Sequence, residues 1–342
     1  GSDHPTVAIR LNNLALLLLA TNRLREAEEP MRRALKIDEA SYGPEHPAVA
    51  RDLNNLAQLL QATNRLAEAE EPMRRALKID EASYGPDHPT VATDLNNLAL
   101  LLQDTNRLAE AESPMRRALK IDEASYGLDH PDVARDLNNL ALMLQDTNRL
   151  AEAEEPMRRA LKIDEVSYGS DHPAVARDLS NLAQLLQATN RLEEAEAPMR
   201  RALKIDEASY GPDHPTVAIR LNNLAQLLKA TNRLEEAEEP MRRALKIDEA
   251  SYGPDHPEVA TDLNNLALLL QDTNRLEEAA EPMRRALGIL LRFTRTVEHK
   301  HPNLDVGVQN YNQLLLDLGK TQEQVQAEIR DLHAEYGVSQ PE

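Results

Sequence analysis

The chain contains no cysteine and no tryptophan, and aromatic residues make up only 3% of its 342 residues. Without cysteine it can form neither a disulfide framework nor a thiol nucleophile. Six of the eight tyrosines recur at one position of a repeated motif, as Tyr42 and Tyr84 do. This regular placement indicates a structural contact rather than an aromatic binding platform.

Positive charge is also scarce. The 39 lysine and arginine residues face 58 aspartate and glutamate residues, which gives a net charge of −19. Nucleic acids and anionic membranes are bound mainly through lysine and arginine, so both are poor partners for this chain. An acidic groove attracts basic peptides. We therefore expect a protein or peptide partner, including one with basic residues, and neither a nucleic acid nor a membrane.

Long hydrophobic runs and glycine-rich loops are missing as well. The apolar run from Leu14 to Ala20 is far shorter than the roughly 20 residues of a membrane span. Glycine occurs mainly at Tyr-Gly junctions, so no phosphate-binding loop is present. Nothing resembles a nucleophile–base pair. We expect no enzymatic activity, no cofactor and a cytoplasmic location.

Internal repetition is what the sequence has in abundance. Glu45-His-Pro and Asp87-His-Pro lie 42 positions apart. The same motif starts at Asp3, Glu45, Asp87, Asp129, Asp171, Asp213 and Asp255. A fixed period of this length is typical of a solenoid, in which each helical unit buries its apolar face against its neighbours. We expect seven such units over residues 3–296.

The sequence of the second unit serves to predict the structure of all seven. Pro47 is suited to the first position of a helix, and apolar residues then follow helical spacing over 47–62. Thr63-Asn64-Arg65 supplies a turn, and a second helix is predicted over 66–83. Gly85 can adopt the left-handed conformation that ends a helix. Each unit is therefore expected to be an antiparallel helix pair.

The recurring histidines precede the first helix of each unit. Adjacent helices pack about 8–10 Å apart, whereas Zn–N bonds are about 2.0–2.1 Å long. Equivalent histidines of neighbouring units therefore cannot share a metal ion. We assign them to helix starts and expect no metal site.

Charged residues of the second helix are spaced for ion pairs. Glu70 precedes Arg74 by four positions, and Glu71 precedes Arg75 by the same interval. Such pairs each stabilise a helix by about 0.2–0.5 kcal/mol. We expect these side chains, and the carboxylates in general, to lie on solvated helix faces.

Several segments resemble a known repeat family. Small side chains at Ala57, Ala69 and Ala76 alternate with large apolar ones such as Leu53 and Met73. This pattern is similar to tetratricopeptide repeats. The phrases LNNLALLLQDTNRLAEAE, RRALKIDEASYG and DHPTVA resemble the 42-residue repeats of kinesin light chains and their bacterial relatives. The resemblance implies an all-α, right-handed superhelical solenoid, a bacterial source, and a scaffold for protein–protein interaction.

The two ends depart from the repeat. Residues 297–342 are expected to form a capping helix pair over 302–318 and 322–336, with a frayed tail from Val338. Gly1-Ser2 resembles the remnant of an expression tag. The first unit has no cap and carries Leu16-Leu17-Leu18-Leu19. We expect that an upstream segment was removed and that this apolar end favours self-association.

Comparison of the seven units separates constant positions from variable ones. Variation gathers at three positions of the first helix that are seven and four residues apart, so they share one face. Candidate contact residues at these positions are Arg51, Arg135, Arg177, Gln58, Gln184, Gln226, Asp104 and Asp146.

A constant asparagine lies on the same face. The resemblance implies that this face lines a concave groove in which asparagine holds the backbone of an extended peptide. A carboxamide can donate and accept at once, which suits that role. We refer to these residues as the first asparagine row: Asn13, Asn55, Asn97, Asn139, Asn181, Asn223 and Asn265. A second asparagine row lies beside it: Asn12, Asn54, Asn96, Asn138, Asn222 and Asn264, with Ser180 in the fifth unit.

Other interpretations stay open at this level. An asparagine row can instead bond to the neighbouring helix, and the variation can reflect recent tandem duplication. A second functional hypothesis is a sensor or autoinhibitory arm of a larger protein with a nucleotide-binding switch or a caspase-like peptidase. A third is a structural spacer that self-assembles.

Overall fold

The computed structural model describes residues 4–297 and 299–338, and every regular element in these ranges is an α-helix. The expected all-α class of helix pairs is confirmed. From here on, the 42-residue units of the sequence are called repeats. The word unit is kept for the two compact parts of the chain, the first ending at Ser170 and the second beginning at Asp171. The first unit contains α1 (Pro5–Ala20), α2 (Leu24–Tyr42), α3 (Pro47–Ala62), α4 (Leu66–Tyr84), α5 (Pro89–Asp104), α6 (Leu108–Tyr126), α7 (Pro131–Asp146) and α8 (Leu150–Tyr168). The second contains α9 (Pro173–Ala188), α10 (Leu192–Tyr210), α11 (Pro215–Ala230), α12 (Leu234–Tyr252), α13 (Pro257–Asp272), α14 (Leu276–Val297), α15 (Leu304–Asp317) and α16 (Gln322–Tyr336).

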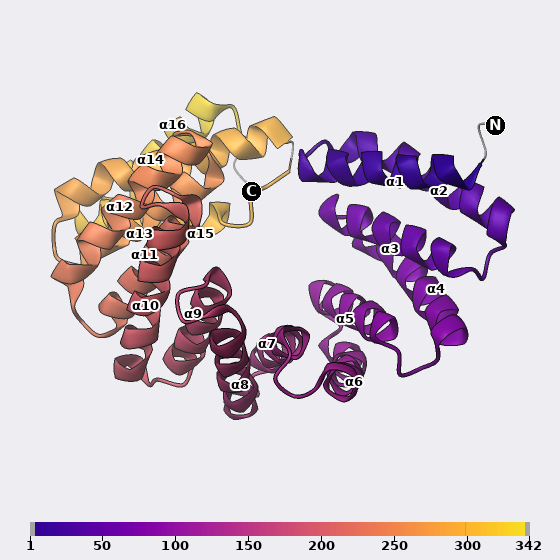
Figure 1. The fold of residues 1–342 in the computed structure, drawn as a ribbon. Coiled ribbons are helices and arrows are strands. Elements are labelled where there is room, and N and C mark those ends of the chain that lie inside the picture. The colour runs from indigo at the N-terminus through magenta and orange to yellow at the C-terminus, as the bar shows by residue number, and fades with distance from the viewer. Residues whose placement is uncertain (1–3, 298, 339–342) are drawn as a thin grey trace. The chain divides into compact units, whose positions relative to one another are not determined.

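Odd- and even-numbered helices alternate in role. We call α1 to α13 with odd numbers the A helices and α2 to α14 with even numbers the B helices. Each A helix packs on the B helix that follows it, and within a unit each B helix packs on the next A helix. Figure 1 shows this succession of pairs in the first unit, from α1 to α8.

The start of each A helix depends on proline and histidine. Pro47 occupies the first turn of α3, and the ring nitrogen Nδ1 of His46 accepts a hydrogen bond from the Ala48 amide at 3.1 Å. The His46 ring also stacks on Tyr42, with 4.6 Å between ring centroids. The predicted helix-start role of the histidines and the structural role of the tyrosines are confirmed in this repeat.

The turns follow from residues that tolerate positive φ. Asn64 has φ 58°, in the left-handed region that asparagine visits more readily than most residues. The Thr63 hydroxyl donates to the Leu59 carbonyl at 2.9 Å and closes the end of α3. Helix α4 ends at Tyr84, one residue beyond the predicted end at 83. Gly85, with φ 92°, follows as the residue that terminates the helix.

The core lies between paired helices and between repeats. Ala57, Ala69 and Ala76 are fully buried, as expected where helix backbones approach closely. Val49 and Leu53 of α3 pack with Ile79 of α4. The same arrangement recurs in the third, fourth and sixth repeats, each of which has a small apolar cluster of its own.

Ion pairs on the B helices only partly follow the predicted spacing. Arg74 contacts Glu70 at 2.8 Å, as predicted. The predicted Glu71–Arg75 pair is wrong, because Arg75 reaches Glu39 of the preceding repeat at 2.7 Å. Spacing within one helix cannot reveal a carboxylate that packing brings from 36 positions away, the interval that also separates Arg117 from Glu81.

The C-terminal helices close the second unit. Helix α14 contains 22 residues, three more than the 19 of α12, and packs on both α15 and α16. Helix α16 has the predicted bounds, and α15 begins at Leu304 rather than Pro302. Residues 1–3 and 339–342, which include the expected tag remnant and most of the expected frayed tail, lie outside the described ranges. None of the helices described here is both long and apolar enough for a transmembrane segment.

Candidate functional site

The first asparagine row lies half-buried along the A helices, apart from the exposed Asn13. Within residues 4–297 and 299–338, the side chains of Asn55, Asn97, Asn181 and Asn265 form no hydrogen bond. Asn139 differs, because it donates to Oδ1 of Asn96 at 3.1 Å. Because the other four carboxamides are half-buried and have no partner within the described ranges, their donors and acceptors are available to a ligand.

The second asparagine row connects consecutive A helices instead. Asn54 Nδ2 donates to Oδ1 of Asp94 at 2.6 Å, and Asn96 makes the equivalent bond to Asp136 at 3.1 Å. Asn12 and Asn222 bond to Asp52 and Asp262, each at 2.6 Å. The interpretation that an asparagine row bonds to the adjacent helix therefore holds for the second row.

The acceptors of these bonds are buried carboxylates. Asp94 of α5 is 1% exposed and lies beside Asp80 of α4, which is 3% exposed. The two carboxyl groups lie close enough for each to affect the ionisation of the other. The expectation that carboxylates lie on solvated faces is wrong here, because helix packing buries one face of each of these two helices.

Burial governs the ionisation of this pair. Desolvation raises the pKa of Asp94 to about 7, assisted by the nearby charge of Asp80 and opposed by the Asn54 hydrogen bond. Asp262 behaves alike, and its pKa is raised to about 7 beside Asp248. Two adjacent carboxyl groups in a poorly solvated site retain one proton between them more readily than isolated aspartates do.

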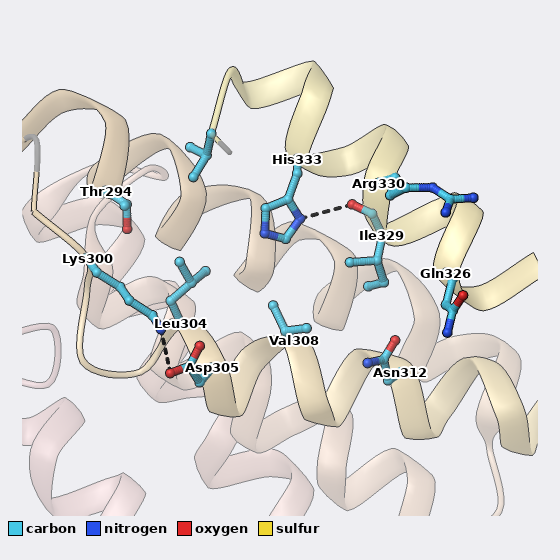
Figure 2. A pocket seen from close by; sticks show the side chains of 11 residues that line it. Thr294, Lys300, Leu304, Asp305, Val308, Asn312, Gln326, Ile329, Arg330 and His333 are labelled. Atoms are coloured by element: carbon cyan, nitrogen blue, oxygen red, sulfur yellow. Dashed lines mark hydrogen bonds and ion pairs between the residues drawn. The ribbon is translucent and has the colours of Figure 1, made fainter. Parts of the chain in front are cut away.

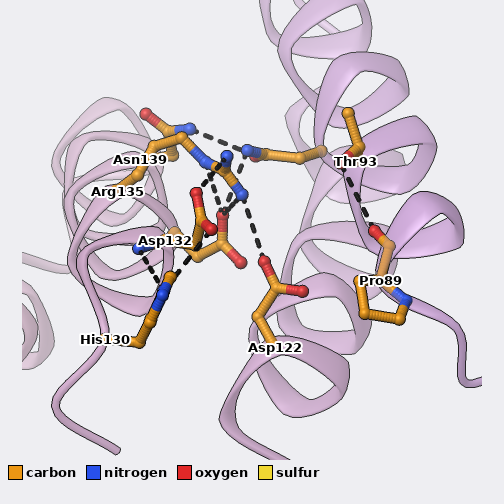
Figure 3. A network of polar contacts seen from close by, with 9 residues as sticks. Pro89, Thr93, Asp122, His130, Asp132, Arg135 and Asn139 are labelled. Atoms are coloured by element: carbon orange, nitrogen blue, oxygen red, sulfur yellow. Dashed lines mark hydrogen bonds and ion pairs between the residues drawn. The ribbon is translucent and has the colours of Figure 1, made fainter. Parts of the chain in front are cut away.

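In other repeats an arginine contacts both aspartates of the equivalent pair. In α7, Arg135 contacts Asp122 at 3.1 Å, Asp132 at 2.9 Å and Asp136 at 2.9 Å. Figure 3 shows the contacts with Asp122 and Asp132. In α3, Arg51 contacts Asp38 at 3.1 Å and Asp52 at 2.8 Å. The predicted contact residues Arg51 and Arg135 are thus held in ion pairs within the chain, and Arg177 contacts Asp178 at 3.0 Å.

The other predicted contact residues are accessible. Gln58, Gln184, Gln226 and Asp104 are exposed. Asp146 is also exposed and accepts a hydrogen bond from Gln103 of α5. The glutamines therefore remain available to a ligand at the second variable position.

A cavity of 510 Å³ opens among α3 to α6 next to the Asp80–Asp94 pair. Asn54 and Asn55 line it together with both aspartates and with His88. It brings the two asparagine rows, one variable position and a buried acidic pair into one place.

A second cavity, of 620 Å³, lies in the C-terminal part of the second unit (Figure 2). Its apolar lining includes Leu304, Val308 and Ile329. Lys300 is paired with Asp305 at 2.6 Å, and Nδ1 of the buried His333 lies 3.0 Å from the Ile329 carbonyl oxygen. The Lys300, Asp305 and His333 side chains are thus engaged within the chain. Across the described residues, no group of three or more His, Asp or Glu side chains could hold a metal ion.

Sequence reasoning missed the acidic pairs, although a signal existed. Asp52 stands three positions after Val49 and four before Leu56, on the apolar face of α3. In the sixth repeat its place is taken by Arg220, which contacts Asp206 at 2.8 Å. An acid replaced by a base at a core-facing position indicates a buried electrostatic contact.

Solved structures share this fold at low sequence identity. Nearly identical TPR-like repeats of a protein described as a kinesin light chain from Podosopora anserina are 22% identical, with a TM-score of 0.53, over 60% of this chain and 98% of theirs. BtubC (BKLC) from P. vanneervenii is 22% identical, with a TM-score of 0.55, over 72% and 93% of the two chains. A tetratricopeptide repeat protein from Parabacteroides merdae is 16% identical, with a TM-score of 0.60, over 91% and 99%.

The sequence comparisons give the family. No curated protein sequence matches this chain. The tetratricopeptide repeat model matches residues 6–82, 73–124, 115–165, 137–208, 199–250 and 241–292. These overlapping matches extend over most of the chain and agree with the fold of the helix pairs, so the chain belongs to the tetratricopeptide-repeat family.

Proposed function

We propose that this protein is a non-catalytic scaffold that binds an extended segment of a partner protein along its A helices. Membership of the tetratricopeptide-repeat family supports a role in protein–protein interaction. The observation that carries the proposal is the first asparagine row, in which half-buried carboxamides such as Asn55 and Asn97 have no hydrogen-bond partner among the described residues.

The chemistry of this row suits a peptide backbone. Each carboxamide presents two donors and one acceptor oxygen, which match the C=O and N–H groups of an extended chain. Exposed glutamines such as Gln58 lie on the same helix face and would contact the side chains of the segment. The constant asparagines would thus provide affinity, and the variable positions would provide specificity.

Selection from a random peptide library tests the proposal within the first unit. The wild type is compared with the triple variant Asn55→Ala/Asn97→Ala/Asn139→Ala. We expect a consensus from the wild type, and binding of the selected peptides at least about tenfold weaker to the variant, since each lost pair of hydrogen bonds contributes about 1–3 kcal/mol.

A matched control removes three equally spaced polar residues from the B helices. Ser41→Ala/Ser83→Ala/Ser125→Ala changes exposed side chains at the ends of α2, α4 and α6. It should bind the selected peptides as the wild type does. Absence of any consensus from a folded wild type, or equal loss of binding in both triple variants, would reject the proposed groove.

Other expectations remain predictions. They include the division into seven repeats and a cap, the sensor-arm alternative, the bacterial source and the cytoplasmic location. Leu14 and Leu17 of α1 are 45% and 60% exposed, and self-association through the first repeat is also still a prediction.

A further inference from the structure

One variable position decides whether an acidic pair contains an arginine. Arg51 and Arg135 occupy this position in α3 and α7, and each bridges two buried aspartates. Thr93 and Thr261 occupy it in α5 and α13. Their hydroxyl groups bond to carbonyl groups of their own helices, Thr93 to Pro89 at 3.3 Å and Thr261 to Pro257 at 3.4 Å. Figure 3 shows Arg135 in contact with the carboxylates of Asp122 and Asp132, and Thr93 bonded to Pro89.

The aspartates next to Thr93 retain the acceptor atoms that bind guanidinium elsewhere. Oδ2 of Asp122 accepts from Arg135 at 3.1 Å. The same oxygen of Asp80 receives no N–H group from any part of the chain that the structure describes. Oδ1 of Asp80 and Oδ2 of Asp94 lack a donor, but so do Oδ1 of Asp122 and Oδ2 of Asp136 beside Arg135. The oxygens that differ are Oδ2 of Asp80 and Oδ1 of Asp94, which stand where Arg135 binds Asp122 and Asp136, and among the described residues Oδ1 of Asp94 accepts only from Asn54. Both side chains are almost fully buried.

Space for a ligand adjoins these oxygens. The 510 Å³ cavity is lined by Asp80, Asp94 and Thr93, and by the rings of Tyr84 and Tyr126. A lining that contains both carboxylates and aromatic residues suits an arginine, because its guanidinium forms bidentate bonds with carboxylates and its flat group stacks on rings. Lysine offers a single point charge and fits this arrangement less well.

The contact between the sixth and seventh repeats has the complete set of acids found around Arg135. Asp248 of the sixth repeat corresponds to Asp122 of the third, and Glu258 and Asp262 of the seventh correspond to Asp132 and Asp136 of the fourth. Thr261 stands in place of the arginine. No lysine or arginine forms an ion pair with these three acids within the described ranges. The sequence positions of the three acids that contact Arg135 are thus all acidic here, and a threonine replaces the arginine.

We propose that the Asp80–Asp94 and Asp248–Asp262 pairs each bind the guanidinium group of an arginine carried by the bound protein segment. The partner's arginine would supply in trans the contact that Arg51 and Arg135 supply within the chain. This inference rests on the proposed function, since it names the side chain that the groove selects.

Burial favours a proton on each pair, and binding of a guanidinium would displace it. The other charged groups that act on the pKa of the first pair are His88 and Glu81, and those that act on the second are His256 and Glu258. Burial raises the pKa of both pairs, so a neutral, protonated pair is favoured at low pH. Arginine should therefore bind more tightly at pH 8 than at pH 5.5.

The test uses acetyl-Gly-Arg-Gly-amide as the probe and the full chain as the receptor. Carboxyl ¹³C resonances of labelled aspartates report binding, and peptides with citrulline or lysine in place of arginine serve as ligand controls. We expect saturable shifts with the arginine peptide and at least about tenfold weaker binding of the citrulline peptide, which lacks the charge.

Variants of the receptor make the test specific. Thr93→Arg/Thr261→Arg should fill both sites from within, as Arg51 and Arg135 do, and abolish the response while the chain remains folded. Asp80→Asn/Asp248→Asn removes the acceptor charge and should also abolish it. Unchanged affinity in either double variant, or equal affinity for the citrulline peptide, overturns the inference.

The peptide library separates this inference from the proposed function. A wild-type consensus without arginine that Thr93→Arg/Thr261→Arg also selects would overturn the arginine sites and leave the groove intact. An empty selection would overturn the proposed groove and with it the assignment of the arginine to a bound segment, and the probe titration would then report only whether the acidic pairs bind a guanidinium group. If free N-acetylarginine amide bound as tightly as the selected peptides do, the assignment of the arginine to a protein segment would be overturned.

Discussion

A guanidinium between two buried carboxylates neutralises charge that the core cannot hold alone. Asp122 and Asp136 are 2% and 0% exposed, and Arg135 contacts both. Because an uncompensated charge in the interior is costly, the ionisation of each pair depends on the residue at this one position of the A helix. The repeats therefore differ in charge while keeping the same fold.

Replacement of Arg135 by threonine should destabilise the fourth repeat. Arg135→Thr removes charged hydrogen bonds to two buried acids, which typically contribute about 1.5–3 kcal/mol each, less the part that solvent screens for a half-exposed arginine. Hydrogen exchange of the α7 amides at pH 8 should become faster. Arg135→Lys should recover only part of the protection, because an ammonium group cannot bridge three carboxylates as a planar fork does. Unchanged exchange in Arg135→Thr would contradict this account.

Local sequence signals determine the helices themselves. The start of α3 at Pro47 and its end before Asn64 were predictable, because proline, histidine and a left-handed asparagine act within a few residues. The acidic pairs were not predictable in the same way. Asp80 and Asp94 lie on different helices, and only the packing of a B helix on the next A helix brings them together.

The helix-start histidine offers a test at the scale of one element. In α5, Nδ1 of His88 accepts from the Thr90 amide at 3.2 Å, and its ring stacks on Tyr84 at 4.8 Å. His88→Ala should destabilise the start of α5 by about 0.5–2 kcal/mol, as loss of a helix cap usually does. His88→Asn keeps a side-chain acceptor and should recover most of this loss. Exchange rates of the Val91 and Ala92 amides give the measurement, and equal rates in the two variants would argue against a capping role.

At the scale of the whole molecule, the repeats combine two opposing responses to pH. Arginine partners lower the pKa of carboxylates such as Glu70 and Glu112 on the B helices, so their contribution to stability is lost as the pH falls through those lowered values. Burial raises the pKa of Asp94 and Asp262 to about 7. Their protonated pairs therefore stabilise the fold at low pH and lose this effect as the pH rises.

Stability should consequently decrease between pH 5 and pH 8. An unfolded aspartate has a pKa of about 3.9, so over most of this range the native chain binds protons that the unfolded chain does not. The free energy of unfolding then falls as the pH rises, by about 1.4 kcal/mol per pH unit for each extra proton bound. Urea unfolding followed by circular dichroism should give a lower midpoint at pH 8 than at pH 5.

The variant Asp94→Asn/Asp262→Asn isolates the acidic pairs from the general repulsion of a chain with net charge −19. An asparagine can donate to the remaining aspartate and still accept from Asn54 or Asn222, so it replaces the shared proton at every pH. Its urea midpoint should change much less between pH 5 and pH 8. A slope as steep as that of the wild type would mean that repulsion across the whole surface, rather than these two buried pairs, sets the pH dependence of the fold.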